Sequence, residues 1–138
     1  MHKVVVERSH GVVSLIAEGY FDETGLTAAA ADLHRAIRSL GARAGRHVTM
    51  YDLTALNVVT PAVLDAFARY FSDPRIAPLW ARRVALVTRS LLVTQQMERV
   101  RQVKDTLRIF NDRRAAMAWL LADQERLRTT SQPTAASG

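Results

Sequence analysis

Cysteine is absent from the 138-residue sequence. Its absence excludes disulfides, thiolate zinc sites, cysteine nucleophiles and thiol redox chemistry, and it agrees with a reducing cytoplasm. Long apolar runs are also missing, because the longest, Ala115 to Ala122, is far shorter than the roughly 20 residues that a membrane-spanning helix needs. The amino terminus lacks the unbroken apolar core of a signal peptide. We therefore expect a soluble cytoplasmic protein.

Catalytic and cofactor motifs are missing as well. No serine lies in a G-x-S-x-G segment, no P-loop is present, and the glycines of Gly41 to Gly45 precede a strand, whereas a dinucleotide fingerprint follows one. The four histidines lack the spacing that a metal site favours, and we interpret them as surface residues. They are His2, His10, His34 and His47. The sequence therefore predicts no catalytic residue, metal site or cofactor.

Basic residues outnumber acidic ones by 19 to 13, and the excess lies in the second half of the chain. Residues 75–114 hold ten basic and three acidic side chains. This excess predicts a weak attraction to anions. No nucleic-acid-binding motif accompanies it, so we interpret these charges as solvated helix faces and expect no nucleic-acid partner.

The pattern of apolar residues predicts five strands and four helices in the order ββαβαβαβα. Lys3 to Arg8 and Val12 to Glu18 form a hairpin around Gly11, and Asp22 caps the first helix. The later strands are predicted at 46–53, 82–88 and 106–110. The remaining three helices begin at Thr60 followed by Pro61, at Ser90, and at Asn111 or Asp112.

A hairpin makes the first two strands antiparallel, whereas helical crossovers make the later strands parallel to one another. The predicted fold is thus a single α/β domain with a mixed five-stranded sheet. We assign residues 1–123 to this domain. Residues 124–138 are small and polar, and we expect them to form a flexible tail.

Polar residues near the carboxyl ends of the predicted parallel strands are the first candidates for a binding surface, because ligands of open α/β sheets bind there. They are Asp52, Asn57, Thr60 and Ser90. Structural roles compete with binding at two of them. Asp52 suits an Asx turn, and the place of Thr60 before Pro61 is explained by helix capping.

An apolar loop forms the second candidate site. Loops are usually polar, and the tryptophan of this one must pack somewhere. The loop either seals one edge of the core or walls an apolar pocket or partner surface. The pocket candidates, together with two phenylalanines of the preceding helix, are Phe67, Phe71, Ile76, Leu79 and Trp80.

Three segments show a family resemblance over roughly residues 3–121. VTMYDLTALNVVTPAVLDAF (48–67), RRVALVTRSLLVTQQMERV (82–100) and RIFNDRRAAMAWL (108–120) resemble the SpoIIAA-like proteins, relatives of STAS domains. The resemblance implies a SpoIIAA-like fold and a non-enzymatic module that binds proteins. STAS anti-sigma-factor antagonists are switched by phosphorylation of a serine in an Asp-Ser pair. Here Thr60 and Pro61 take the places of that pair, and proline cannot be phosphorylated.

Two hypotheses about function follow from the sequence. The first is a protein-binding or regulatory module that acts through the 57–60 segment and the helix after it, with homodimerisation as one option. The second is a carrier or sensor of a small apolar ligand between helices and sheet, which a more distant resemblance to CRAL-TRIO lipid carriers implies.

Overall fold

The computed structural model describes the backbone of residues 1–130, and the side chains in that range except those of 57, 58, 103 and 123–130. Within these residues the chain forms five strands, four α-helices and two short 3-10 helices. The strands are β1 His2–Glu7, β2 Val12–Phe21, β3 Val48–Val59, β4 Arg83–Val87 and β5 Leu107–Phe110. The helices are α1 Glu23–Arg38, η1 Gly41–Arg43, α2 Pro61–Tyr70, η2 Pro74–Leu79, α3 Leu91–Val103 and α4 Arg113–Thr130.

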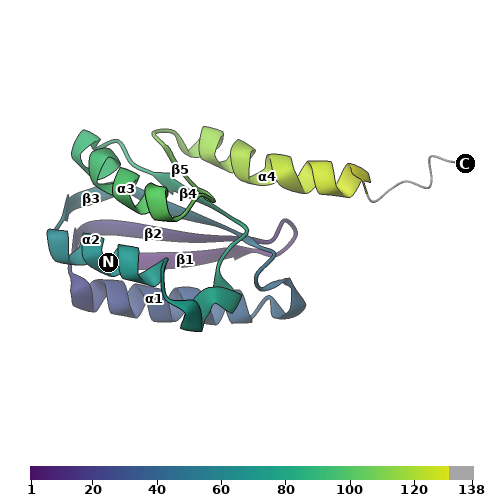
Figure 1. Cartoon of the computed structure of the whole chain (residues 1–138), viewed down its shortest axis with the longest axis horizontal. Helices are drawn as coiled ribbons and strands as arrows, with labels where there is room; N and C mark the ends of the chain where they lie inside the picture. Colours follow the sequence, from purple (N-terminus) through teal and green to yellow (C-terminus); the bar gives the residue numbers. More distant parts are fainter. Residues whose placement is uncertain (131–138) are drawn as a thin grey trace, which may run out of the picture.

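The predicted order of elements and the mixed five-stranded sheet are confirmed (Figure 1). β1 pairs antiparallel with β2, and Gly11 in the connecting turn has a φ of 66°, which glycine adopts without strain. β2, β3, β4 and β5 are parallel. The backbone of 124–130, the first part of the predicted tail, is helical, because α4 continues to Thr130. Residues 131–138 lie outside the described residues, and the division of the domain at residue 123 stays a prediction.

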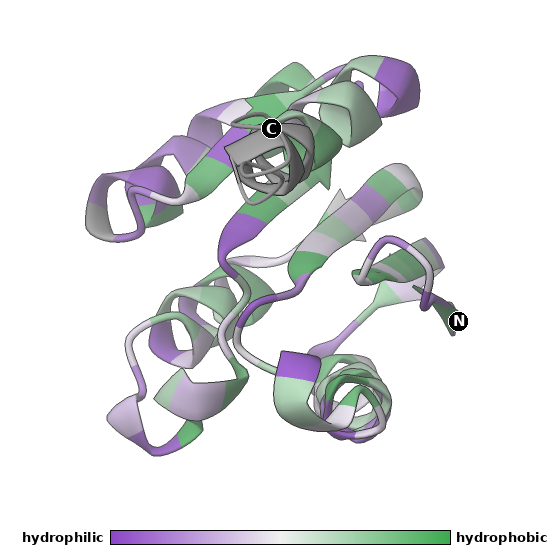
Figure 2. Ribbon diagram, turned by 90° about the vertical axis from the view of Figure 1, so that its right-hand side faces the viewer, coloured by the Kyte–Doolittle hydropathy of each residue, from purple (hydrophilic) through white to green (hydrophobic). Residues whose placement is uncertain are grey.

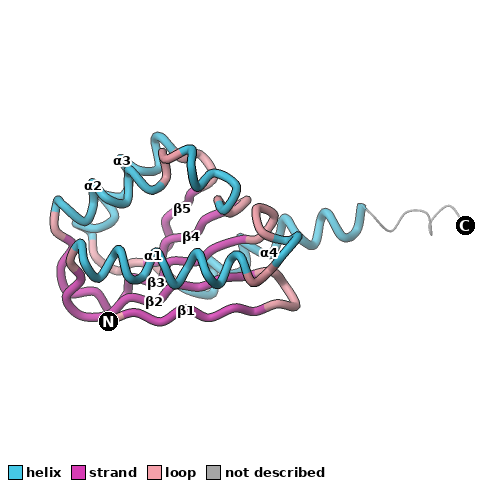
Figure 3. Tube along the Cα trace, turned by 90° about the horizontal axis from the view of Figure 1, so that it is seen from below, coloured by secondary structure: helices cyan, strands magenta, loops and turns pink. Residues whose placement is uncertain are grey.

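The strands follow one another across the sheet in chain order, from β1 to β5. Because each crossover between parallel strands is right-handed and all of them advance in the same direction, α1, α2 and α3 must lie on the same face. Figure 3 shows these three helices together on one side of the twisted strands. Strand order thus determines which face each helix covers, and the sequence alone does not reveal that order.

The sheet separates two apolar clusters. The larger one packs the buried sides of α1, α2 and α3 against alternate strand residues such as Leu15, Tyr51 and Leu86. On the opposite face, Ala116 and Leu120 of α4 pack on a smaller cluster, and α4 is the one helix among the described residues that contributes to it. The end-on view in Figure 2 shows α4 and α1 on opposite sides of the strands.

Helix caps define where three of the helices begin. Asp22, Thr60 and Ser90 each accept a hydrogen bond from the backbone N–H three residues later, as the sequence predicts. These caps satisfy N–H groups that have no partner within the helix. The carboxyl ends of β2, β3 and β4 therefore lead into three well-defined helix starts at the same edge of the sheet.

β3 corrects one sequence prediction. The segment 54–59 was expected to be a loop, but it continues the strand to Val59 and pairs with the end of β2. The register shifts between the Ile16–Asp52 and Glu18–Ala55 pairs, which is a β-bulge. β2 also runs beyond the predicted end at Glu18, through Gly19 with a φ of 71°, to Phe21. The two strands extend each other, and neither extension is visible in the local sequence.

Candidate functional site

The carboxyl edge, which we define by Tyr20, Thr60, Ser90, Leu91 and Leu92, is where β2 ends and where α2 and α3 begin. The hydroxyl oxygen of Thr60 accepts from the N–H of Val63 at 3.3 Å, and that of Ser90 from the N–H of Val93 at 3.1 Å. Both hydroxyls therefore serve as helix caps. Asn57 lies within β3 by its backbone, and its side chain is outside the described residues.

Asp52 holds the bulge and α4 together. Its Oδ1 accepts from the backbone N–H of Thr54 at 3.1 Å and from the hydroxyl at 2.7 Å, while Oδ2 accepts from Arg113 at 2.8 Å. Burial raises the pKa of Asp52, but the hydrogen bonds from Thr54 and Arg113 outweigh it and hold that pKa below its ordinary value. The carboxylate is thus ionised at neutral pH and fully occupied by structural partners.

Replacing Asp52 with asparagine is expected to lower the free energy of unfolding by about 1 kcal/mol, because Arg113 loses its charged acceptor. Arg113→Gln should cause a similar loss, and the double variant little more, since one shared contact is removed. Urea unfolding of the four proteins at neutral pH measures this coupling. Fully additive losses would show that the two side chains act independently.

Large exposed apolar side chains mark the same edge. Leu91 and Leu92 are 73% and 61% exposed, and Tyr20 is 64% exposed. Beside Leu91 a groove of about 490 Å³ runs between the start of α3 and the end of β5. It is lined by Thr88, Arg89, Leu91, Thr94, Ile109, Phe110 and Asn111. Isolated exposed leucines are common, but two adjacent ones at the start of a helix make this edge a candidate binding surface.

The period of α3 carries a sequence signal for the two leucines. Val93, Met97 and Val100 define the buried stripe of α3. Leu91 precedes Val93 by two positions, so it lies on the opposite side of the helix, where a leucine has no core to enter. The exposed pair could therefore have been found from the period of the helix.

The five apolar pocket candidates are not gathered around one space. Phe71, Leu79 and Trp80 border a void of about 10 Å³, room for a single water molecule. Phe67 lines a cavity of about 540 Å³ between α1 and α2, and Ile76 lines an open groove next to it. The apolar loop itself folds as η2. Its Trp80 packs under the ammonium of Lys104, 4.0 Å from the ring centre.

The histidines correct a second prediction. His47, directly before β3, is 1% exposed and is a core residue, not a surface one. His34 is half-buried beside Tyr70, whose hydroxyl lies 3.1 Å from its Nε2. No group of three or more metal-binding side chains occurs among the described residues. In the same part of the chain no helix has the length and apolar character to cross a bilayer.

The order of strands, the three helices on one face and the capped helix starts define the class: a SpoIIAA-like α/β domain. No protein-family model and no curated protein matches the sequence. Two solved structures carry the comparison. An uncharacterized protein of the DUF3478 family with a SpoIIAA-like fold, from Shewanella loihica PV-4, aligns with a TM-score of 0.63 at 20% identity, covering 87% of this chain and 95% of that one.

The second structure is an anti-sigma factor antagonist from Mycobacterium paratuberculosis. It aligns with a TM-score of 0.55 at 16% identity, covering 87% of this chain and 94% of its own. These alignments confirm the SpoIIAA-like fold that the sequence predicts. The more distant resemblance to CRAL-TRIO carriers stays a prediction.

Proposed function

We propose that this domain is a non-enzymatic regulatory module that binds another protein through the carboxyl edge. The observation that carries the proposal is the adjacent pair Leu91 and Leu92, which are 73% and 61% exposed at the start of α3. Burying two such leucines in an interface removes their apolar surface from water, which stabilises the complex. Leu91 also borders the groove at the end of β5, which offers a recess for a partner side chain.

The polar groups of this edge favour binding over catalysis. The hydroxyl oxygens of Thr60 and Ser90 accept the helix-capping hydrogen bonds. Both carboxylate oxygens of Asp52 accept hydrogen bonds, from Thr54 and Arg113. A nucleophile or general base must instead be available to a substrate. The arrangement supports a surface that keeps its shape and presents apolar and charged groups to a partner.

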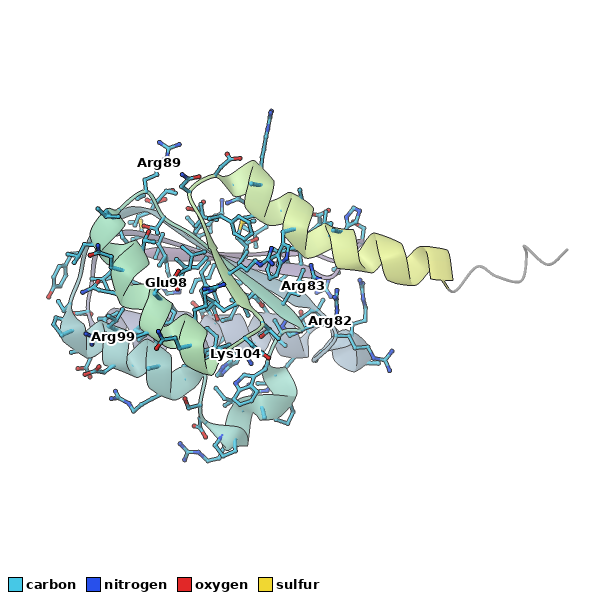
Figure 4. All side chains as sticks on the ribbon, turned by 45° about the horizontal axis from the view of Figure 1, so that its top comes forward. Arg82, Arg83, Arg89, Glu98, Arg99 and Lys104 are labelled. Atoms are coloured by element: carbon cyan, nitrogen blue, oxygen red, sulfur yellow. The ribbon has the colours of Figure 1, made fainter. Side chains whose placement is uncertain are left out.

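Charge at the edge supports selection of an acidic partner surface. Arg89 is exposed between β4 and α3 and projects away from the body of the domain (Figure 4). It lines the groove beside Leu91, and no carboxylate is among the groove's lining residues. An apolar centre with an arginine beside it resembles the composition of protein interfaces, in which arginine is enriched.

The fold of the two structural neighbours is consistent with this proposal. One of them is an anti-sigma factor antagonist, a protein named for its action on another protein. In this chain Pro61 occupies the first position of α2, where a serine could otherwise carry a phosphate. We infer that partner binding is not switched by phosphorylation at this position.

Leu91→Ser combined with Leu92→Ser is expected to weaken partner binding by at least about tenfold, because exposed apolar anchors dominate many interfaces. The partner is first isolated from native cell extract with tagged wild-type protein and identified by mass spectrometry. Dissociation constants are then measured with the purified partner by calorimetry. Serine is tolerated in the first helical turn, so the double variant should keep the wild-type melting temperature.

Val5→Ser is the matched control, since Val5 is an exposed apolar residue on β1, 41% exposed and away from the carboxyl edge. It should bind the partner as the wild type does. Sedimentation of wild-type protein alone distinguishes a second copy of this chain from a different partner. Failure to retain any protein, or equal binding by the double leucine variant, would contradict the proposal.

A further inference from the structure

The cavity between α1 and α2 has the build of a small-molecule site. Its volume of about 540 Å³ lies in the usual range of ligand pockets. Leu15 and Leu33 of the larger apolar cluster form its apolar floor, with Phe67 of α2 at the side. Small alanines such as Ala30 and Ala66 on the facing helices leave the space open. The cavity is therefore apolar over most of its lining.

One end of the cavity carries a chain of polar groups. The hydroxyl of Tyr51, which is 3% exposed, interacts with the hydroxyl of Tyr70, and burial is the main cause that raises the pKa of both tyrosines. The Tyr70 hydroxyl lies 3.1 Å from Nε2 of His34, and the two rings stack with centres 5.4 Å apart. With the Tyr70 hydroxyl donating to Nε2, neutral His34 carries its hydrogen on Nδ1. Burial, with a smaller contribution from Arg38, lowers the pKa of His34, so the neutral form prevails at neutral pH.

This arrangement leaves His34 with a donor for a ligand. Nδ1 of His34 has no hydrogen-bond partner among the described residues. Tyr51, Tyr70 and His34 all line the cavity, and the Tyr70 hydroxyl is already engaged with Nε2 of His34. A ligand that places an acceptor at this end would therefore complete the chain at His34.

The charges at the cavity end favour an anion. The cavity and the open groove beside it share His34, Tyr70, Asp73 and Arg75. Asp73 is already paired with Arg75, whose Nη2 lies 2.9 Å from Oδ2. Arg69 also lines the groove and has no ion-pair partner within the described part of the chain. One guanidinium thus remains uncompensated at the opening.

We propose that the cavity binds a small amphipathic monocarboxylate, with its apolar chain between α1 and α2 and its carboxylate at His34 and Arg69. A single carboxylate matches one ring N–H and one uncompensated guanidinium, and the alkyl chain matches the apolar floor. This inference rests on the ligand-binding alternative for function. It does not depend on the carboxyl edge, so either can fail without the other.

Isothermal titration with sodium octanoate and with octan-1-ol tests the proposal on the wild-type protein. Octanoate is expected to bind with a Kd of about 100 µM or tighter, and the alcohol about tenfold more weakly, because hydrogen bonds to a charged group are the stronger ones. Arg69→Gln should remove most of this difference by weakening octanoate while leaving the alcohol unchanged. Arg101→Gln, on the exposed side of α3, is the charge control and should change neither affinity.

Filling the cavity tests its location. Ala30→Phe is expected to weaken octanoate by at least about tenfold, whereas Ala28→Phe, an exposed position on the same helix, should stay within about twofold of the wild type. Ala66→Leu fills the same space from α2 and replaces Ala30→Phe if that variant does not fold. Circular dichroism melts report on folding in each case.

Three results would overturn the inference. A wild-type Kd for octanoate weaker than about 1 mM would contradict the proposed binding site. Equal affinity for octanoate and octan-1-ol would show that the protein does not recognise the carboxylate. Undiminished binding by a folded cavity-filling variant would place the ligand elsewhere on the protein. Loss of partner binding at Leu91 and Leu92 changes none of these readouts.

Discussion

Leu120→Ala is expected to lower the free energy of unfolding by about 3 kcal/mol, the middle of the range for fully buried leucines. Leu120 is 0% exposed and packs on the sheet face opposite α1, α2 and α3. Its neighbours there include Met50, Val87 and Val48, each 0% exposed. Because α4 is the helix that covers this face among the described residues, a cavity at Leu120 has no second helix to close it.

Leu121→Ala is the matched control. Leu121 is next to Leu120 in the same helix but only half-buried, and the same substitution there should cost about 1 kcal/mol or less. Urea unfolding followed by circular dichroism measures both variants. Equal small losses at the two positions would mean that α4 contributes little to the fold and that the face beneath it tolerates water.

Additional contacts anchor α4 beyond its leucine. Arg83 donates to the carbonyl oxygen of Trp119 at 2.9 Å, and its guanidinium lies 4.7 Å from the centre of the Trp119 ring. At the start of the helix Arg113 reaches Asp52 on β3. α4 is thus held at its start and in its middle, which explains why it can cover the face alone.

Local sequence signals predicted the parts of this fold that local physics determines. Asp22, Thr60 and Ser90 were recognised as caps because a short polar side chain before an apolar period is enough to satisfy the free N–H groups of a helix. The hairpin was recognised from Gly11 between two β-branched runs. Each of these features is decided within a few residues of the chain.

Features decided by distant segments were missed. The end of β3 contains Asn57, a residue type that is depleted in strands, and pairing with the extended end of β2 makes the segment a strand. The space at Phe67 exists because Ala30 and Ala66, 36 positions apart, face each other across α1 and α2. No period or motif within either helix predicts that these two alanines face each other.

The same limit applies to His34 and His47. Their spacing gives no indication of a metal site, and spacing says nothing about burial. His34 is defined by a tyrosine on another helix, and His47 by its place at the start of a central strand. Burial is the property that gives these two residues physical consequences.

Acid is expected to destabilise the domain through His47. Nδ1 of His47 accepts from the N–H of Gly45 at 3.1 Å, and Nε2 is buried without a hydrogen-bond partner among the described residues. Burial, with a smaller contribution from Arg82, lowers the pKa of His47 from its ordinary 6.5 to about 4. A charged imidazolium would break the Gly45 contact and place an unpaired charge in the core.

The sign of the pH effect follows from the two pKa values. Between about pH 6.5 and pH 4 the unfolded chain binds a proton at His47 and the folded chain does not, so lowering the pH through this window favours unfolding. The contribution is fully present above pH 6.5 and is lost progressively toward pH 4. Its size should be about 2 to 3 kcal/mol. His34, whose pKa is also lowered by burial, acts in the same direction.

His47→Asn isolates this effect, because the amide oxygen of asparagine can still accept the N–H of Gly45 while the side chain cannot titrate. The variant is expected to be less stable than the wild type at pH 7, since it leaves a gap in the core, but to lose much less stability between pH 7 and pH 4.5. Urea midpoints across this range measure the slope. An equally steep loss in His47→Asn would assign the acid sensitivity to another group.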